Sequence, residues 1–162
     1  MVKVRLSTLL LILLPLQLQA LSSDSEQPIA VEADKLEVRD GEKISIYEGN
    51  VSLVQGSLQI QSDRLVIHFG EAGVLMLMEM TGNPARFRQL DDEQQELVGE
   101  AAQIDYLESE STLELRGNAK FRHAGDSIES NLIRVNTENN AIRAGSSQPD
   151  ERVKMLIRPK QE

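Results

Sequence analysis

The sequence contains neither cysteine nor tryptophan, and only five of its 162 residues are aromatic. Without cysteine, disulfides, thiolate metal sites and a catalytic cysteine are excluded. Proteins that bind nucleic acid or sugar by stacking need more aromatic side chains than this. Acidic residues outnumber basic residues by 26 to 17, and the net charge of −9 disfavours binding to a phosphate backbone. The share of hydrophobic residues, 40%, and of charged residues, 27%, is that of one ordinary globular domain.

The first twenty residues have the features of a secretory signal peptide. Lys3 and Arg5 precede an apolar run that is about half as long as the roughly 20 residues of a membrane-spanning helix. We therefore expect residues 1–20 to be cleaved rather than retained as an anchor. Residues 21–158 should then form one domain, followed by a short tail at 159–162. The exported chain has 15 basic and 26 acidic residues, a net charge of −11.

Most of the remaining chain alternates between apolar and polar residues, as at positions 43–46, 58–61 and 113–116. Such alternation places apolar side chains on one face of a β-sheet and polar side chains on the other. Turn-forming residues recur every 6 to 12 positions, and no stretch of ten residues favours a helix. This spacing predicts an all-β sandwich, jelly roll or barrel, with a long loop at residues 90–95.

The chain also contains an internal repeat. The segment GNVSL at residues 49–53 recurs 68 positions later as GNAKF at 117–121, and a third copy begins with Gly-Asn at 82–83. A unit of about 34 residues, holding roughly four short strands, predicts an elongated stack with one continuous apolar interior. Each Gly-Asn pair is expected to take positive φ angles in a hairpin turn.

Candidate catalytic and metal-binding residues are few. His68 and His123 have no metal-motif spacing, and neither a nucleophile elbow nor a phosphate-binding glycine loop is present. Acidic residues are plentiful, but the sequence singles out no pair of them for acid–base catalysis. We therefore expect no enzymatic activity and no cofactor.

The strongest remaining feature is a set of aliphatic residues in the first half of the chain, at the apolar positions of its alternating segments. Composition alone favours a core filled by its own side chains, but adaptable aliphatic residues also suit a groove that holds acyl chains. The candidate groove residues are Ile29, Val31, Leu36, Val38, Ile44, Ile46, Val51, Leu53, Leu58, Ile60, Leu65 and Ile67.

Five stretches, in order, resemble the LptA or OstA-like family of periplasmic lipopolysaccharide-transport proteins: residues 27–34, 47–51, 54–60, 82–89 and 115–119. The resemblance runs from about residue 27 to residue 158. The related LptC proteins share the fold but keep a membrane anchor, and the short apolar run at the start of this chain argues against such an anchored paralogue.

The resemblance implies an open, slightly twisted antiparallel β-jelly roll. It implies a periplasmic carrier with the acyl chains of lipopolysaccharide in its groove, near Ile29 and Val31 of the first strand. Copies would join head to tail into a bridge between the inner and outer membranes. An inner-membrane LptC-like protein would bind the N-terminal edge, and an outer-membrane LptD-like protein the C-terminal edge.

The strand ends and the basic residues lead to two further expectations. Val153, Met155 and Ile157 share one phase of a final strand, and an open edge there can pair with another chain. Two basic pairs in equivalent repeat positions could meet an anionic head group or simply face solvent: Arg86 with Arg88, and Lys120 with Arg122.

Two other classes of protein stay open as alternatives. A secreted carbohydrate-binding module or a small jelly-roll lyase would need aromatic platforms or a charged catalytic cluster. A purely structural β polymer would share the repeats but would have a closed, filled interior.

Overall fold

The structure is a computed structural model that describes residues 24–139, 141–145 and 151–158. The expected signal peptide, residues 1–20, and the expected tail, residues 159–162, lie outside the described residues, so both stay predictions.

The described residues form one sheet of ten strands, every pair of which is antiparallel. Helical structure among them is limited to three-residue 3-10 turns. The expected all-β fold is therefore confirmed, and the predicted long loop lies between two of the strands, at residues 91–95. The strands are β1 (Ala30–Glu32), β2 (Lys35–Arg39), β3 (Ile44–Gln55), β4 (Leu58–Phe69), β5 (Leu75–Leu90), β6 (Glu96–Leu107), β7 (Thr112–His123), β8 (Asp126–Asn136), β9 (Ile142–Ala144) and β10 (Lys154–Leu156).

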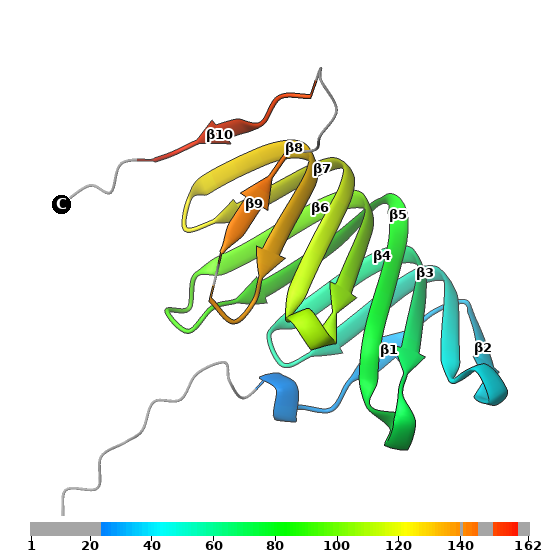
Figure 1. Ribbon diagram of the computed structural model, residues 1–162. Coiled ribbons are helices and arrows are strands. Elements are labelled where there is room, and N and C mark those ends of the chain that lie inside the picture. The colour runs from blue at the N-terminus through cyan, green and yellow to red at the C-terminus, as the bar shows by residue number, and fades with distance from the viewer. Residues whose placement is uncertain (1–23, 140, 146–150, 159–162) are drawn as a thin grey trace, which may run out of the picture.

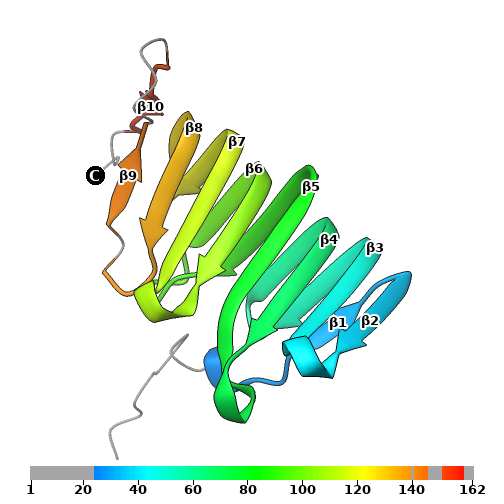
Figure 2. The same ribbon diagram turned by 45° about the vertical axis from the view of Figure 1, so that its right-hand side comes forward.

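Each of the six long strands, β3 to β8, bends near its middle, so that its two halves lie in two different layers of the sheet (Figures 1 and 2). Each pairing between neighbouring long strands has a register shift near its middle, where the strands bend. One layer begins with β2 and ends with β9, and we call it the first layer. The second layer begins with β1 and ends with β10. The predicted repeat unit of about 34 residues therefore corresponds to two bent strands, or four half-strands.

The Gly-Asn pairs lie at these bends and not in hairpin turns. Gly49 and Asn50 have φ angles of 80° and 46°, and Gly117 and Asn118 have φ angles of 80° and 50°. The predicted positive φ is confirmed for these two pairs and is wrong for the third, since neither Gly82 nor Asn83 has a positive φ. All three pairs lie inside strands, in β3, β5 and β7. The hairpin prediction is wrong because the extra residue forms a bulge, which bends a strand without ending it.

Cross-strand neighbours align in continuous rows that run the length of each layer. One row of the second layer and one row of the first layer face each other and supply much of the single hydrophobic core. The second-layer row is Val31, Leu53, Ile60, Phe87, Gly99, Phe121, Ile128 and Met155. The first-layer row is Leu36, Tyr47, Leu65, Met80, Ile104, Leu115, Ile133 and Ala144.

The two ends of the stack are open. At one end β1 and β2 each pair only with β3, and at the other end β9 and β10 each pair only with β8 among the described residues. Figure 2 shows these two pairs of short strands at opposite ends of the molecule. The ladder starts after Pro28, as its missing N–H group predicts.

Candidate functional site

A groove of about 780 Å³ opens between the two layers, on the side where the hairpin turns lie. Its volume is within the range of small-molecule and cofactor sites. The floor is apolar and comes from both layers, because the strands direct alternate side chains inward. It includes Leu58, Ile60, Leu75, Met78, Met80, Phe87, Leu97, Leu113 and Val135.

The rim of the groove is acidic along part of its length and apolar elsewhere. Residues 91–93, in the loop that follows β5, lie on the second-layer side, and Glu108 and Glu138 lie on the first-layer side. Ile29 and Val74 also line the groove, and both are exposed. A ligand with long apolar chains could therefore place them against the floor while its polar part stays at the mouth.

Two polar residues stabilise this rim. Burial, followed by hydrogen bonding to Glu108, raises the pKa of Tyr106 to about 12, so this hydroxyl stays protonated. A ring nitrogen of His123 lies 2.6 Å from Oδ2 of Asp91. Burial alone would raise the pKa of Asp91, but hydrogen bonds from His123 and from two backbone amides of the loop outweigh it and lower this pKa. The contacts of Asp91 link the 91–95 loop to β7 at the mouth of the groove.

Asp24 anchors the N-terminal segment beside the same groove. Its carboxylate accepts hydrogen bonds from the Ser57 backbone N–H at 2.9 Å, the Ser57 hydroxyl at 2.5 Å and the Gln89 amide at 3.3 Å. A Cβ atom on Gly56 would overlap this carboxylate, so the turn between β3 and β4 needs glycine there. The sequence did not reveal this site, because Asp24 and its partners are 33 and 65 positions apart.

The predicted groove residues separate into those that line the groove and those that form the core beneath it. Ile29, Leu58 and Ile60 line the groove directly. Val31 packs against the core from the edge strand. The remaining inward-facing residues are buried in that core and support the floor: Val51, Leu53, Leu65 and Ile67. Contact of any of these residues with a ligand stays a prediction.

Four further candidates lie away from the groove. Leu36 and Val38 share the inward phase, because they pair with Tyr47 and Ser45, but they are exposed at the open end. Ile44 and Ile46 face the outside of the first layer instead. They pair with His68 and Val66, whereas the core residues Leu65 and Ile67 pair with Tyr47 and Ser45. The inward phase of β3 is the same on both sides of the bulge, since Tyr47 and Leu53 both face the core. The prediction for Ile44 and Ile46 is wrong because apolar residues occupy the outward phase in the first half of β3, where Ile46 lies opposite Val66 and both are buried.

The predicted end-to-end residues are exposed at the C-terminal end. Met155 lies in β10 opposite Ile128 and continues the inward row, whereas Val153 and Ile157 flank this short strand. All three side chains are exposed, as is that of Leu156. Binding of another molecule to this edge stays a prediction.

The two basic pairs lie on the outer face of the second layer, away from the groove. Arg86 and Lys120 both form ion pairs with Glu100, at 3.3 and 3.2 Å, and Arg88 pairs with Glu96. Their cross-strand neighbours are on the phase opposite to Phe87 and the core. Burial alone would raise the pKa of Glu100, but hydrogen bonds and charge from Lys120 and Arg86 lower it. The basic side chains on this face are therefore paired with carboxylates of the same face.

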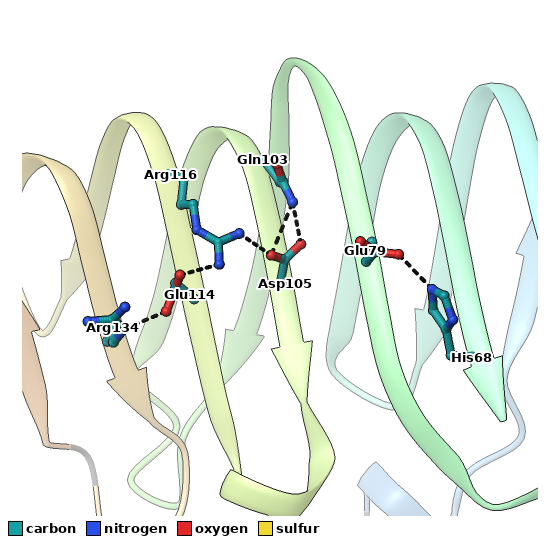
Figure 3. Close-up of polar contacts among 7 residues, drawn as sticks. All are labelled: His68, Glu79, Gln103, Asp105, Glu114, Arg116 and Arg134. Atoms are coloured by element: carbon teal, nitrogen blue, oxygen red, sulfur yellow. Dashed lines mark hydrogen bonds and ion pairs between the residues drawn. The ribbon is translucent and has the colours of Figure 1, made fainter. Parts of the chain in front are cut away.

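A second polar network, which the sequence did not predict, covers the outer face of the first layer (Figure 3). Arg116 bridges Asp105 and Glu114, which are cross-strand partners, and Arg134 also pairs with Glu114. On the next strands Nε2 of His68 lies 2.6 Å from Glu79. Figure 3 shows these contacts running from strand to strand, so they hold the layer together on the side away from the groove.

Neither a metal centre nor a membrane span is evident in the part of the chain that the structure describes. Within it, no three His, Asp or Glu side chains are grouped to hold a metal ion. No helix within it has the length and hydrophobicity to cross a membrane.

Comparison with known proteins links this fold and groove to lipopolysaccharide export. The lipopolysaccharide export system protein LptH of Pseudomonas aeruginosa is 28% identical over 148 residues, which cover 87% of this chain and 85% of LptH. The export system protein LptA of Escherichia coli K12 is 28% identical over 144 residues, 88% of this chain and 77% of LptA. The crystal structure of P. aeruginosa LptH, described as the LptA-homologous periplasmic component of the lipopolysaccharide transport device, matches with a TM-score of 0.76 and 26% identity, over 85% of this chain and 99% of that chain.

The family profile described as "LptA/(LptD N-terminal domain) LPS transport protein" matches residues 30–141, from the first strand to the last turn before β9. This range includes every long strand and nearly all of the groove floor. The chain is therefore an open antiparallel β-jelly roll that belongs to the LptA/(LptD N-terminal domain) family of lipopolysaccharide transport proteins.

Proposed function

We propose that this protein is a periplasmic carrier of lipopolysaccharide, which binds the acyl chains in the groove between its two layers and assembles end to end into a bridge between the inner and outer membranes. The observation that supports this most strongly is the groove itself, which has an apolar floor and is open along one side of the jelly roll. The chain's membership of a lipopolysaccharide transport family supports the same role. A structural β polymer needs no such opening.

The groove suits acyl chains better than sugars. Its floor has aliphatic and methionine side chains, which adapt to flexible chains, and aromatic residues suited to stacking are few. Each buried CH₂ group contributes about 0.8 kcal/mol, so one chain of about a dozen carbons contributes on the order of 10 kcal/mol. A groove that covers such chains lets lipid cross an aqueous compartment.

The open ends support assembly with other chains of the same fold. β1 and β2 leave one side unpaired at the N-terminal end, and β9 and β10 do so at the C-terminal end, among the described residues. Unpaired strand edges bind another strand by main-chain hydrogen bonds. We assign the N-terminal edge to an inner-membrane LptC-like protein and the C-terminal edge to an outer-membrane LptD-like protein, with copies of this chain between them. A contact between two different edges builds an open rod and not a closed ring.

The proposed role is binding and transfer, without catalysis. A passive binder only shifts an equilibrium, so net flow toward the outer membrane requires energy from the inner-membrane partner. The groove needs only to accept lipid at one end and release it at the other.

The direct experiment is uptake and release of lipid by the purified, delipidated protein. We expect it to take up lipopolysaccharide from micelles and to pass it to a second, tagged copy. An oligosaccharide without acyl chains is the matched control and should not compete. Uptake of the sugar alone, or failure to bind lipopolysaccharide at all, would contradict the proposal.

A further inference from the structure

Charged residues end two of the rows on the outer faces of the molecule. In the second layer, one row runs Glu32, Ser52, Gln61, Arg86, Glu100, Lys120, Glu129 and Lys154. In the first layer, the corresponding row begins with Glu37 and ends with Arg134 and Arg143. Both rows therefore start with a carboxylate at the N-terminal end and finish with a cation at the C-terminal end.

The charge pattern inside these rows indicates what would lie beyond their ends. From Arg86 to Lys154 the sign of the charge alternates at every strand, and two of these contacts are ion pairs around Glu100. The next member of this series would be acidic. In the first layer Arg143 lies opposite Arg134, a like-charge pair that a carboxylate on the outer side would offset.

The direction of the strands allows a second copy to continue both layers. Each layer contains eight strands among the described residues, since β3 to β8 belong to both and each layer adds one short strand at each end. With an even number of alternating strands, a copy placed by simple translation presents β1 antiparallel to β10 and β2 antiparallel to β9. The antiparallel ladder then continues across the joint without a reversed strand.

We propose that the joint between two copies has one defined register, in which Lys154 faces Glu32 of the next copy and Arg143 faces its Glu37. This inference rests on the proposed end-to-end assembly and adds the register and the residues that specify it. Among the described residues, Glu32, Arg143 and Lys154 form no ion pair within their own chain. Glu37 pairs with Arg39 at 2.6 Å, on the exposed edge.

The same register also buries the exposed apolar residues of both ends. Met155 would face Val31 of the next copy, and Ile142 would face its Val38. Val38, Ile142 and Met155 are between 36% and 61% exposed, although they lie on the inward phase. A slip by one residue would move these side chains to the outside and place the charges inward. The charged pairs therefore select the register, and the apolar rows supply most of the binding energy.

Charge reversal tests this register in the intact mature protein. Sedimentation velocity over a range of concentrations gives the concentration of half-assembly at low ionic strength. Glu32→Lys and Lys154→Glu should each raise that concentration about fivefold, because each replaces an attractive pair by a repulsive one. The double variant Glu32→Lys/Lys154→Glu restores an opposite-charge pair and should return close to wild type. The mismatched variant Glu32→Lys/Arg143→Glu has two repulsive contacts and should assemble less than either single variant.

Three controls separate the register from other causes. Arg122→Glu makes the same charge change as Lys154→Glu on the same outer face, but Arg122 lies opposite Ser127 inside the stack, and this variant should assemble like wild type. At about 1 M salt, where charges are screened within about 3 Å, all variants should converge. Uptake of lipopolysaccharide by every variant should match wild type, so a loss of uptake would count against the proposed function and not the register. A double variant no better than the singles, an Arg122→Glu defect as large as that of Lys154→Glu, or a wild type that stays monomeric would each overturn the register.

Discussion

The ring of Phe87 lies over Gly99, its cross-strand partner in β6, so closely that a Cβ atom on Gly99 would overlap the ring. Phe121 follows in the same row, and the two phenylalanine rings lie 6.4 Å apart between their centroids. Both rings are buried, and Phe87 contributes to the groove floor. The absence of a side chain at Gly99 is therefore what allows two large rings in one row of the interior.

Gly99→Ala should destabilise the protein by about 1–3 kcal/mol, because the added methyl group forces the Phe87 ring from its position in a packed core. Thermal unfolding should show a midpoint lower by about 3–10 °C. Gly41→Ala is the matched control, since Gly41 has no atom within 4 Å of the added Cβ and should unfold like wild type. Equal midpoints for the two variants would contradict this packing.

Asp24→Asn should loosen the N-terminal segment without unfolding the domain. The change removes a buried carboxylate that accepts three hydrogen bonds, at a cost of about 1–2 kcal/mol. Hydrogen exchange of the Ser57 amide, which donates to Asp24, should become about 5- to 30-fold faster. Glu26→Gln, on the exposed surface two residues later, should leave this rate unchanged.

The Asp24 contact should also depend on pH in one direction. Burial alone would raise the pKa of Asp24, but hydrogen bonds from Ser57 and Gln89 outweigh it and lower the pKa from its usual 3.8. A lowered pKa means that the stabilisation is complete above pH 3.8 and is lost as the pH falls through the folded-state value. The exchange difference between wild type and Asp24→Asn should therefore shrink in acid. A difference that grows as the pH falls would contradict the assignment.

Arg116→Ala should leave two nearly buried carboxylates, Asp105 and Glu114, facing each other across β6 and β7. Because Arg116 itself is about half exposed, we expect a loss of about 1–3 kcal/mol at neutral pH in chemical denaturation. Burial alone would raise the pKa of Glu114, but hydrogen bonds from Arg134 and the charge of Arg116 lower it below 4.5. The repulsion in the variant should thus fade in acid, as Glu114 becomes protonated. Arg122→Ala should have little effect at any pH.

The periodicity of the sequence predicted the fold better than it predicted the site. Alternation identified inward residues such as Leu53 and Ile60 correctly, because a regular strand keeps its phase. It misplaced Ile44 and Ile46, because this half of β3 has apolar residues on its outward phase, where Ile46 is buried opposite Val66, and a polar residue, Ser45, at an inward position. The Asp24 anchor and the Arg116 network could not be predicted either, because they depend on strand register between distant segments.

Removal of residues 153–162 should prevent end-to-end assembly but leave a folded domain. The deletion takes away β10, whose three residues are all exposed and pair only with β8. We expect the free energy of unfolding to stay within about 1 kcal/mol of wild type. Light scattering should give a constant monomer mass for the truncated protein and a rising mass for the full chain. Equal masses at all concentrations, together with continued lipid transfer between truncated copies, would contradict pairing through this strand.

Site-specific photo-crosslinking to lipopolysaccharide tests the central claim most directly. A photoreactive residue at Ile29, on the groove wall, or at Val31, on the inward phase of β1, should trap the lipid. The same residue at Glu32, on the outward phase of β1, or at the exposed Val54 of β3 should not. Because Val54 is apolar and exposed, it controls for unspecific adhesion of lipid to hydrophobic surface. Trapping at Ile29 and Val31 alone is the result that a lipid-filled groove predicts, whereas equal trapping at all four positions, or none at Ile29 and Val31, would contradict it.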